Sequence, residues 1–170
     1  MSQTEEKQPK ETDAIKKRLE DYAAYQRKID NQIERLETLT ATMGSPSTPN
    51  LSGLPSGGGD GTSKTERQIL KKMELEDKIR AMIQQERQWR TELEALIETM
   101  KNPDEQTVIE MRYFDRMKWW PICSVLYSGE ADYEEKADKY LKRTFKLHGS
   151  ALQALARVYN EKNQTNTQQE

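Results

Sequence analysis

Two stretches of the chain, residues 12–43 and 64–101, place apolar or near-apolar residues at alternating steps of three and four. This spacing keeps one face of a helix apolar along its whole length and is typical of a coiled-coil seam. The first seam is Ile15, Leu19, Tyr22, Gln26, Ile29, Ile33, Leu36 and Met43, and the second is Leu75, Ile79, Met82, Glu86, Trp89, Leu93, Leu96 and Met100. We therefore expect two long coiled-coil helices. Gln26 either selects the register or partner of its seam, or is a tolerated polar residue.

Residues 44–63, GSPSTPNLSGLPSGGGDGTS, separate these helices. Neither helix nor strand propagates through so many glycines and prolines, so the segment is predicted to be a flexible linker. Ser63 or Thr65 can cap the helix that follows. The two helices are long enough to pair with each other or with a second chain, and the seams alone do not choose between a hairpin and a homo-oligomer.

Composition limits what the rest of the chain can be. Only 34% of the 170 residues are apolar and 33% are charged, which favours helices with narrow apolar stripes over a large core. No run is long and apolar enough to span a membrane, and the N-terminus has no apolar secretory region, so we expect a cytoplasmic protein without a membrane partner. The polar ends, 1–11 and 161–170, are predicted to be disordered.

A small helical domain is predicted over residues 102–160. Asn102 followed by Pro103 and Glu105 is typical of a helix start, with Asn as the cap and Glu105 reaching back to it. Helices are expected over 103–116, over 119–127 and through a basic segment that continues to about residue 160. The predicted fold is therefore all-α: two coiled-coil helices joined by a Gly/Pro/Ser-rich linker, then this domain.

The net charge is only −2, but acidic and basic residues are distributed unevenly along the sequence. Residues 129–138 carry five acids and one base, whereas residues 139–160 carry five bases and no acid. At 100° per residue, Lys139, Lys142, Arg143, Lys146 and Ser150 fall on one side of a helix, and Leu141, Phe145, His148, Leu152, Leu155 and Tyr159 fall opposite. We expect one side to dock and the other to meet an anionic partner.

The run EQTVIEMRYFDRMKWWPICSVLYS resembles the first half of the helix-turn-helix in region 4 of sigma factors and in related phage activators. The ending FKLHGSALQAL and the connector LPSGGGDGTSKTERQI are similar to those of late-gene transcription activators from phages of Gram-positive bacteria, and the similarity covers roughly residues 12–157. It implies a helix-turn-helix core formed by Ile109, Tyr113, Trp119, Ile122, Cys123, Leu126, Phe145, Leu147 and Leu152.

The resemblance implies a sequence-specific transcriptional regulator that binds double-stranded promoter DNA, activates late genes in a bacterial host cytoplasm and has RNA polymerase as a further partner. The basic segment then corresponds to the recognition helix. Arg143 is the candidate for reading bases, and Lys139, Lys142 and Lys146 position the helix on phosphates, with Ser150 on the same face.

Several residues near this segment have structural interpretations. Cys123 occupies a position where the motif usually has alanine, which a small buried thiol fits. We expect His148 to be packed and hydrogen-bonded, and Gly149 to mark a close crossing with an earlier helix. Trp119 is expected in the core, whereas Trp120 is expected to be exposed, touching RNA polymerase or a sister subunit, or to be partly covered.

The sequence departs from the resemblance at residues 129–138, where the family has only a few residues. Either this acidic insert is a loop plus an N-terminal extension of the recognition helix from about Asp132, or it remodels the DNA contact. We favour the extension, because Asp132 followed by Glu134 and Glu135 is the charge order of a helix N-terminus. The insert can also mask the basic face until DNA competes.

No catalytic constellation is recognisable, so neither enzymatic activity nor a cofactor is expected. A single cysteine and a single histidine exclude a disulfide framework and an ordinary zinc site, and GGGDG lacks the Gly-Lys-Ser/Thr of a P-loop. Two other functions remain open: a phage DNA-packaging component such as a small terminase subunit, and a coiled-coil interaction scaffold.

Overall fold

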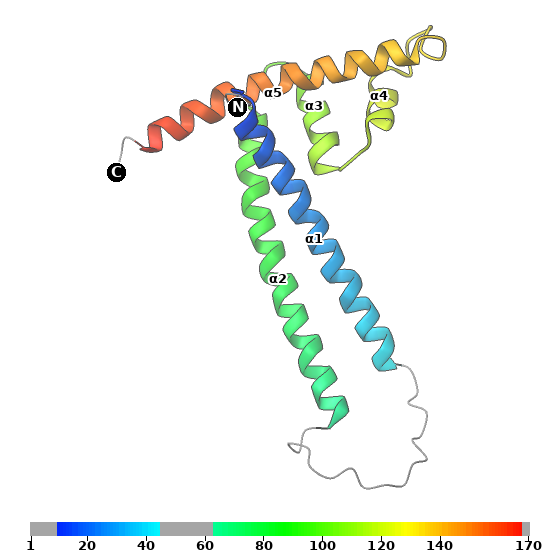
Figure 1. The fold of residues 1–170 in the computed structure, drawn as a ribbon, viewed down its shortest axis with the longest axis vertical. Helices are drawn as coiled ribbons and strands as arrows, with labels where there is room; N and C mark the ends of the chain where they lie inside the picture. Colours follow the sequence, from blue (N-terminus) through cyan, green and yellow to red (C-terminus); the bar gives the residue numbers. More distant parts are fainter. Residues whose placement is uncertain (1–9, 45–62, 168–170) are drawn as a thin grey trace, which may run out of the picture. The chain divides into compact units, whose positions relative to one another are not determined.

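A computed structural model describes residues 10–44 and 63–167, and within these ranges the fold is all-α, with no strand. The elements are α1 (Asp13–Gly44), α2 (Lys64–Ile97), α3 (Pro103–Ile109), the π-helical turn η1 (Glu110–Phe114), α4 (Trp119–Tyr127) and α5 (Ala137–Thr167) (Figure 1). None of these helices combines the length and apolarity that crossing a membrane requires. The predicted linker, apart from Gly44 and Ser63, lies outside the described residues, as do residues 1–9 of the N-terminus.

The chain divides into two compact units. Unit 1 contains the residues up to Ala24 together with those from Trp89 onward, and unit 2 is Tyr25–Gln88. Each long helix therefore contributes to both units. This division differs from the predicted boundary at residue 102, because the start of α1 and the end of α2 share one core with the C-terminal helices.

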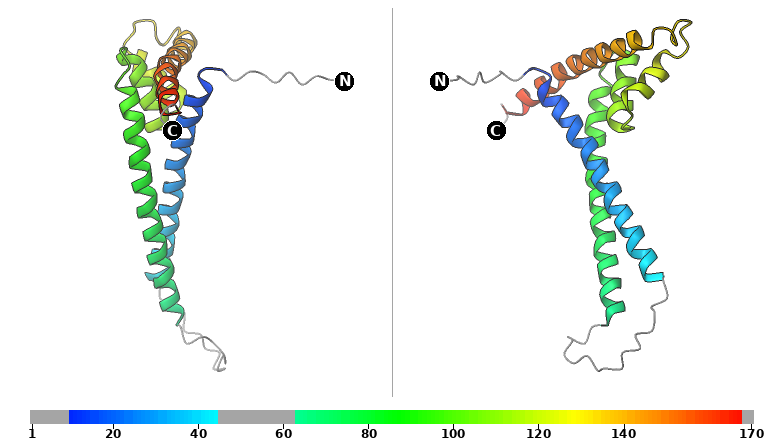
Figure 2. Two further views of the ribbon diagram at one scale, coloured as in Figure 1. Left: turned by 90° about the vertical axis from the view of Figure 1, so that its left-hand side faces the viewer. Right: turned by 45° about the vertical axis from the view of Figure 1, so that its right-hand side comes forward.

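Unit 2 is a pairing of α1 with α2 from the same chain. The two helices run antiparallel (Figure 2) and supply its buried side chains, which are Ile29, Gln32, Ile79 and Met82. Of the other predicted seam residues here, Gln26, Ile33, Leu36, Met43, Leu75 and Glu86 are only half-buried. Ser63 caps α2 as expected: its Oγ accepts from the Glu66 amide at 3.1 Å, and the Glu66 carboxylate accepts from the Ser63 amide at 2.8 Å.

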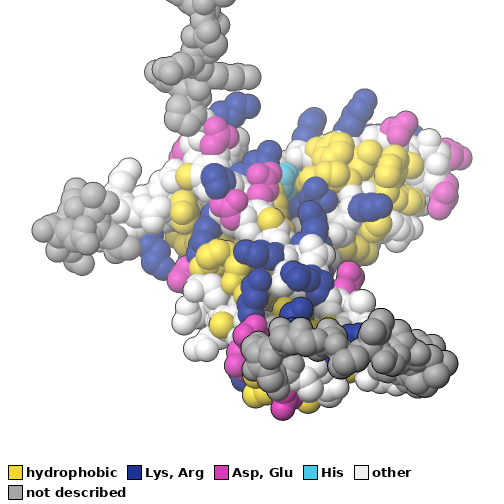
Figure 3. Space-filling model, turned by 60° about the horizontal axis from the view of Figure 1, so that its bottom comes forward, with side chains coloured by type: hydrophobic (Ala, Val, Ile, Leu, Met, Phe, Trp, Pro, Cys, Tyr) yellow, Lys and Arg dark blue, Asp and Glu magenta, His cyan; other side chains and the backbone are white. Residues whose placement is uncertain are grey.

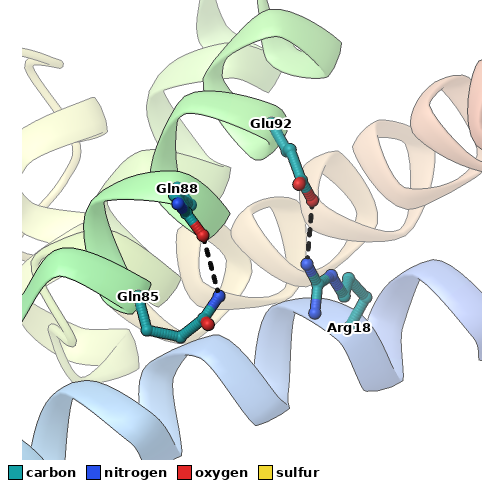
Figure 4. Close-up of polar contacts among 4 residues, drawn as sticks. All are labelled: Arg18, Gln85, Gln88 and Glu92. Atoms are coloured by element: carbon teal, nitrogen blue, oxygen red, sulfur yellow. Dashed lines mark hydrogen bonds and ion pairs between the residues drawn. The ribbon is translucent and has the colours of Figure 1, made fainter. Parts of the chain in front are cut away.

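Unit 1 has a core to which every helix contributes. Its buried residues are Ile15, Leu19 and Tyr22 of α1, Leu93, Leu96, Ile97 and the nearby Met100 from α2, Val108, Ile109, Met111, Tyr113 and Phe114 of α3 and η1, Ile122 of α4, and Ala151, Leu152, Leu155 and Ala156 of α5. The Tyr22 ring meets Phe114 edge-on with centroids 5.1 Å apart. At the rim, Arg18 bonds Glu92 at 3.0 Å (Figure 4) and lies over Trp89. The start of α1 and the end of α2 thus belong to the same core as α5.

Helix α2 ends at Ile97, four residues before the predicted end at residue 101. The last turn tightens, with the Met100 amide donating to the Ile97 carbonyl at 3.0 Å, and Gln106 Nε2 donates to the carbonyls of Ile97 at 3.2 Å and Met100 at 2.9 Å. Free carbonyls at a helix end need such partners. The next helix begins as expected, since Asn102 Oδ1 accepts from the Asp104 amide at 3.0 Å.

The single helix predicted over 103–116 is instead an α-helix followed by a π-helical turn. The Asp115 amide donates to the Glu110 carbonyl at 3.0 Å, which is the wider spacing of a π-helix. Arg116 then takes a positive φ of 54°, and the chain turns into α4. The turn brings Met111, Tyr113 and Phe114 into the core together. Helix α4 spans 119–127 as predicted.

Helix α5 begins at Ala137, so the favoured extension from Asp132 is wrong. Residues 128–136 form consecutive turns instead, with the Tyr133 amide bonded to the Glu130 carbonyl at 3.1 Å. Asp132 does not act as a helix cap, because its carboxylate accepts hydrogen bonds from the side chains of Lys136 and Tyr140. At the other end α5 continues to Thr167, so residues 161–167 are helical rather than part of a disordered tail.

Candidate nucleic-acid interface

The outward face of α5 carries the predicted cations. Lys139, Lys142, Arg143 and Lys146 are all exposed, and none of them takes part in an ion pair within the described residues. Arg157, further along the helix, is exposed as well. We call Lys139, Lys142, Arg143 and Lys146 the basic face. Exposed cations that are not neutralised by the protein are available to phosphate or to base edges.

The opposite side of α5 packs on α3 and α4, as expected. Of the residues predicted for this side, Leu152 and Leu155 are buried, whereas Leu141, His148 and Tyr159 are half-buried and Phe145 is exposed. Tyr140, Thr144, Ala151 and Leu155 are buried. They are spaced four, seven and four residues apart, so they share one side of the helix. The Thr144 hydroxyl donates to the Tyr140 carbonyl at 3.0 Å, so a polar residue can lie fully buried here. This face could have been predicted from the sequence if Tyr and Thr had been counted among the possible core residues of the helix.

Phe145 is the clearest correction to the predicted core, because its side chain is 43% exposed. It lies at the edge of the packed face, where it meets Trp119 edge-on with centroids 5.0 Å apart. Leu126, Leu147 and Trp119 are half-buried, whereas Ile109, Tyr113, Ile122, Cys123 and Leu152 are buried as expected.

A polar and aromatic cluster lies under this part of α5. The Tyr113 hydroxyl and His148 Nε2 are 3.0 Å apart, and Trp119 meets His148 edge-on with centroids 4.9 Å apart. Burial, reinforced by the positive charges of Lys16 and Arg112, lowers the pKa of His148 to about 4. Burial also raises the pKa of Tyr113 to about 12. Both groups are therefore neutral near pH 7, which fits the structural role predicted for His148.

Ser150 is exposed, but its hydroxyl donates to Glu105 Oε1 at 2.5 Å. Two expectations change as a result. Ser150 is engaged by α3 rather than available to DNA, and Glu105 bonds to α5 rather than reaching back to the cap at Asn102. The contact also places a carboxylate beside the basic face.

Gly149 does not mark a close helix crossing. A Cβ atom at this position would have no neighbour within 4 Å. Cys123 behaves as expected of a small buried thiol, with the Tyr133 hydroxyl 3.9 Å from its Sγ. Within residues 10–44 and 63–167, no group of His, Cys, Asp or Glu side chains is arranged to hold a metal ion.

The outer face of α4 is uncharged. Trp120 is 49% exposed and Val125 61% exposed on a helix without any charged residue. Figure 3 shows a face of the molecule on which apolar side chains form an exposed patch with lysine and arginine side chains at its edge. Trp120 is therefore exposed, which agrees with the first of the two expectations for it, while its contact with a partner stays a prediction.

The acidic insert forms a tyrosine-rich contact with α4 and α5 that sequence reasoning missed. Asp132 accepts from the Lys136 ammonium at 2.7 Å and from the Tyr140 hydroxyl at 2.6 Å, and these bonds lower the pKa of Asp132 to about 2. The bond to Asp132, with burial, raises the pKa of Tyr140 to about 12. The Tyr140 ring lies 5.3 Å from Tyr127 and 5.8 Å from Tyr133, centroid to centroid.

A family model matches part of the chain. A family described as a protein of unknown function (DUF1492) matches residues 65–143, from the start of α2 through the first turns of α5. The matched range includes the whole acidic insert and ends at Arg143. No curated protein and no solved structure matches the chain. The match assigns no activity to the chain.

Proposed function

We propose that this chain is a sequence-specific DNA-binding transcriptional regulator, with phage or prophage late-gene activation as the role implied by its resemblance to phage activators. The observation that carries the proposal is the basic face of α5: four exposed cations without acidic partners, on a helix fixed by its opposite side. A helix presented in this way has the form that major-groove recognition requires.

The proposed roles follow from side-chain chemistry. Arg143 reads a base, because its planar guanidinium can make two hydrogen bonds to one guanine. Lys139, Lys142 and Lys146 neutralise phosphates and fix the helix on the duplex. We assign no DNA contact to Ser150, since Glu105 holds its hydroxyl. The proposal includes no catalytic residue, cofactor or metal.

The proposed partners are promoter DNA, a second copy of the chain and RNA polymerase. Homo-oligomerisation through the coiled-coil helices would present two basic helices to half-sites related by two-fold symmetry. The uncharged outer face of α4, with Trp120 and Val125 exposed, is the surface we assign to RNA polymerase. The proposed location is the cytoplasm of the bacterial host.

The test is selection of a preferred duplex from a random library, followed by affinity measurements for that duplex and a scrambled one. We expect Arg143→Ala to reduce the preference for the selected duplex by about 5- to 100-fold, the loss of one bidentate base contact. Arg80→Ala is the matched control, because Arg80 is an exposed arginine of α2 that pairs with Asp77 at 2.9 Å. This variant should leave the preference unchanged.

Other outcomes would support the other functions. Equal affinity for both duplexes would contradict a sequence reader and favour a DNA-packaging component. No affinity for either duplex would favour an interaction scaffold. Sedimentation of the protein with and without the selected duplex would give the stoichiometry, and a complex with a single copy would contradict the two-half-site arrangement.

A further inference from the structure

The acidic insert is joined to the basic face through a continuous set of side-chain contacts. Asp132 holds the Tyr140 hydroxyl at 2.6 Å, and the Tyr140 ring lies against Tyr127 at the end of α4. The Arg143 guanidinium lies over the Tyr127 ring, 5.0 Å from its centroid. Contacts thus run from an insert residue to the side chain proposed to read bases.

The stacking constrains Arg143 without occupying its hydrogen-bonding groups. A guanidinium over an aromatic ring is attracted to the ring face through its charge, and this attraction uses none of its N–H donors. A base contact uses those donors. Stacking also removes rotamer freedom before DNA binds, so less entropy is lost on binding.

The insert does not neutralise the basic face by direct pairing. The ion pair that it forms in the described residues is internal, between Asp132 and Lys136, and none links its acids to Lys139, Lys142, Arg143 or Lys146. Its contacts with α4 and α5 are made by tyrosines: Tyr133 reaches Cys123, and Tyr140 is bonded to Asp132. These contacts fix the start of α5, where the basic face begins.

We propose that residues 128–136 form a specificity element, which holds Arg143 in its base-reading orientation through Asp132, Tyr140 and Tyr127. This inference rests on the proposed DNA-binding function and extends it. Tyr127, Tyr140 and Asp132 are positioning residues that act through Arg143. They set how well the protein distinguishes one duplex from another, while the lysines of the basic face supply affinity for any duplex.

The decisive experiment is a double-mutant cycle between Tyr127 and Arg143, measured as the ratio of affinities for a selected and a scrambled duplex. Tyr127→Leu removes the ring and should lower this ratio by about 2- to 5-fold, the worth of an exposed cation–π contact. Tyr127→Phe keeps the ring and should restore the ratio. In the Arg143→Ala background, Tyr127→Leu should have no further effect.

Two controls separate positioning from a general loss of structure. Glu134→Gln changes an exposed acid of the same insert and should leave the ratio unchanged. Asp132→Ala should lower the ratio in the wild-type background and have no effect in the Arg143→Ala background. Helix content and thermal midpoint are recorded for each variant, so that unfolding is recognised directly.

A measurement without DNA tests the contact itself. The Arg143 side-chain protons should show upfield ring-current shifts in the NMR spectrum, lost in Tyr127→Leu and kept in Tyr127→Phe. If the wild-type protein prefers no duplex but these shifts are present, the proposed function fails while the contact stands. If the wild-type protein discriminates and Tyr127→Leu lowers the ratio equally in both backgrounds, the positioning role is overturned.

Discussion

His148 is buried in its neutral form, and this makes folding sensitive to mild acid. Its pKa is about 4 in the folded chain, against an ordinary value of 6.5. As the pH falls from 6.5 towards 4, the unfolded chain takes up a proton that the folded chain does not. The contribution of this group to the free energy of unfolding should therefore be constant above about pH 7.5 and fall as the pH drops towards 4, by at most about 3 kcal/mol, since His148 is only partly buried and solvent screening reduces the effect.

Urea unfolding followed by circular dichroism between pH 7.5 and about 5 tests the effect of His148. His148→Gln keeps a polar group that can bond the Tyr113 hydroxyl but does not titrate. The variant should show a shallower loss of stability than the wild type over this range. Identical pH profiles for the two proteins would contradict the assignment to His148.

Gly149 is a residue that the fold does not require. It lies within α5, and a Cβ atom there would have no neighbour within 4 Å. Gly149→Ala should raise the free energy of unfolding by about 0.5–1 kcal/mol, because alanine loses less backbone entropy on forming a helix. Gly129→Ala is the control, since it is equally uncrowded but lies outside a helix, and its gain should be smaller. A lower thermal midpoint for Gly149→Ala would show that the glycine is needed.

Among the elements, the acidic insert also carries acids that can act on the basic face only through longer-range electrostatics. Glu134 and Glu135 are exposed and make no ion pair with the basic face. Replacing both by glutamine should raise affinity for the selected and the scrambled duplex alike, several-fold at low salt, and the gain should vanish at high salt, where charges at this range are screened. An unchanged affinity at low salt would argue against masking. Deleting 130–138 is a poorer test, because it also removes the Asp132–Tyr140 bond.

At the scale of the whole molecule, charge distribution matters more than the net charge of −2. If the basic face binds phosphates, log affinity should fall linearly with log salt concentration. Lys142→Ala should reduce the magnitude of that slope by about 1. Lys17→Ala should not, since Lys17 is paired with Asp21 at 2.6 Å on α1. Equal slopes for wild type and Lys142→Ala would remove Lys142 from the DNA contact.

Features that depend only on neighbouring residues could be predicted from the sequence. The spacing of apolar residues placed α1 within one residue of its observed bounds. The sequence also marked the helix start at Asn102 and, with Thr65 as the alternative, the one at Ser63. The exposed cations of α5 also followed from sequence, because charged side chains avoid burial and share one helical face. These are local properties, so they can be read without knowing what packs nearby.

Contacts between residues far apart in the sequence could not be predicted in this way and are known from the tertiary structure. It joined the ends of the long helices to the C-terminal helices in one core, and it buried Thr144 while leaving Phe145 exposed. In the same structure the Ser150 hydroxyl bonds to Glu105. Contacts through Tyr140 and Tyr127 join Asp132 to Arg143. Periodicity defines an apolar side of a helix but not the exact orientation of that side against a neighbouring helix. This orientation determines whether the residues at the edge of each face are buried or exposed.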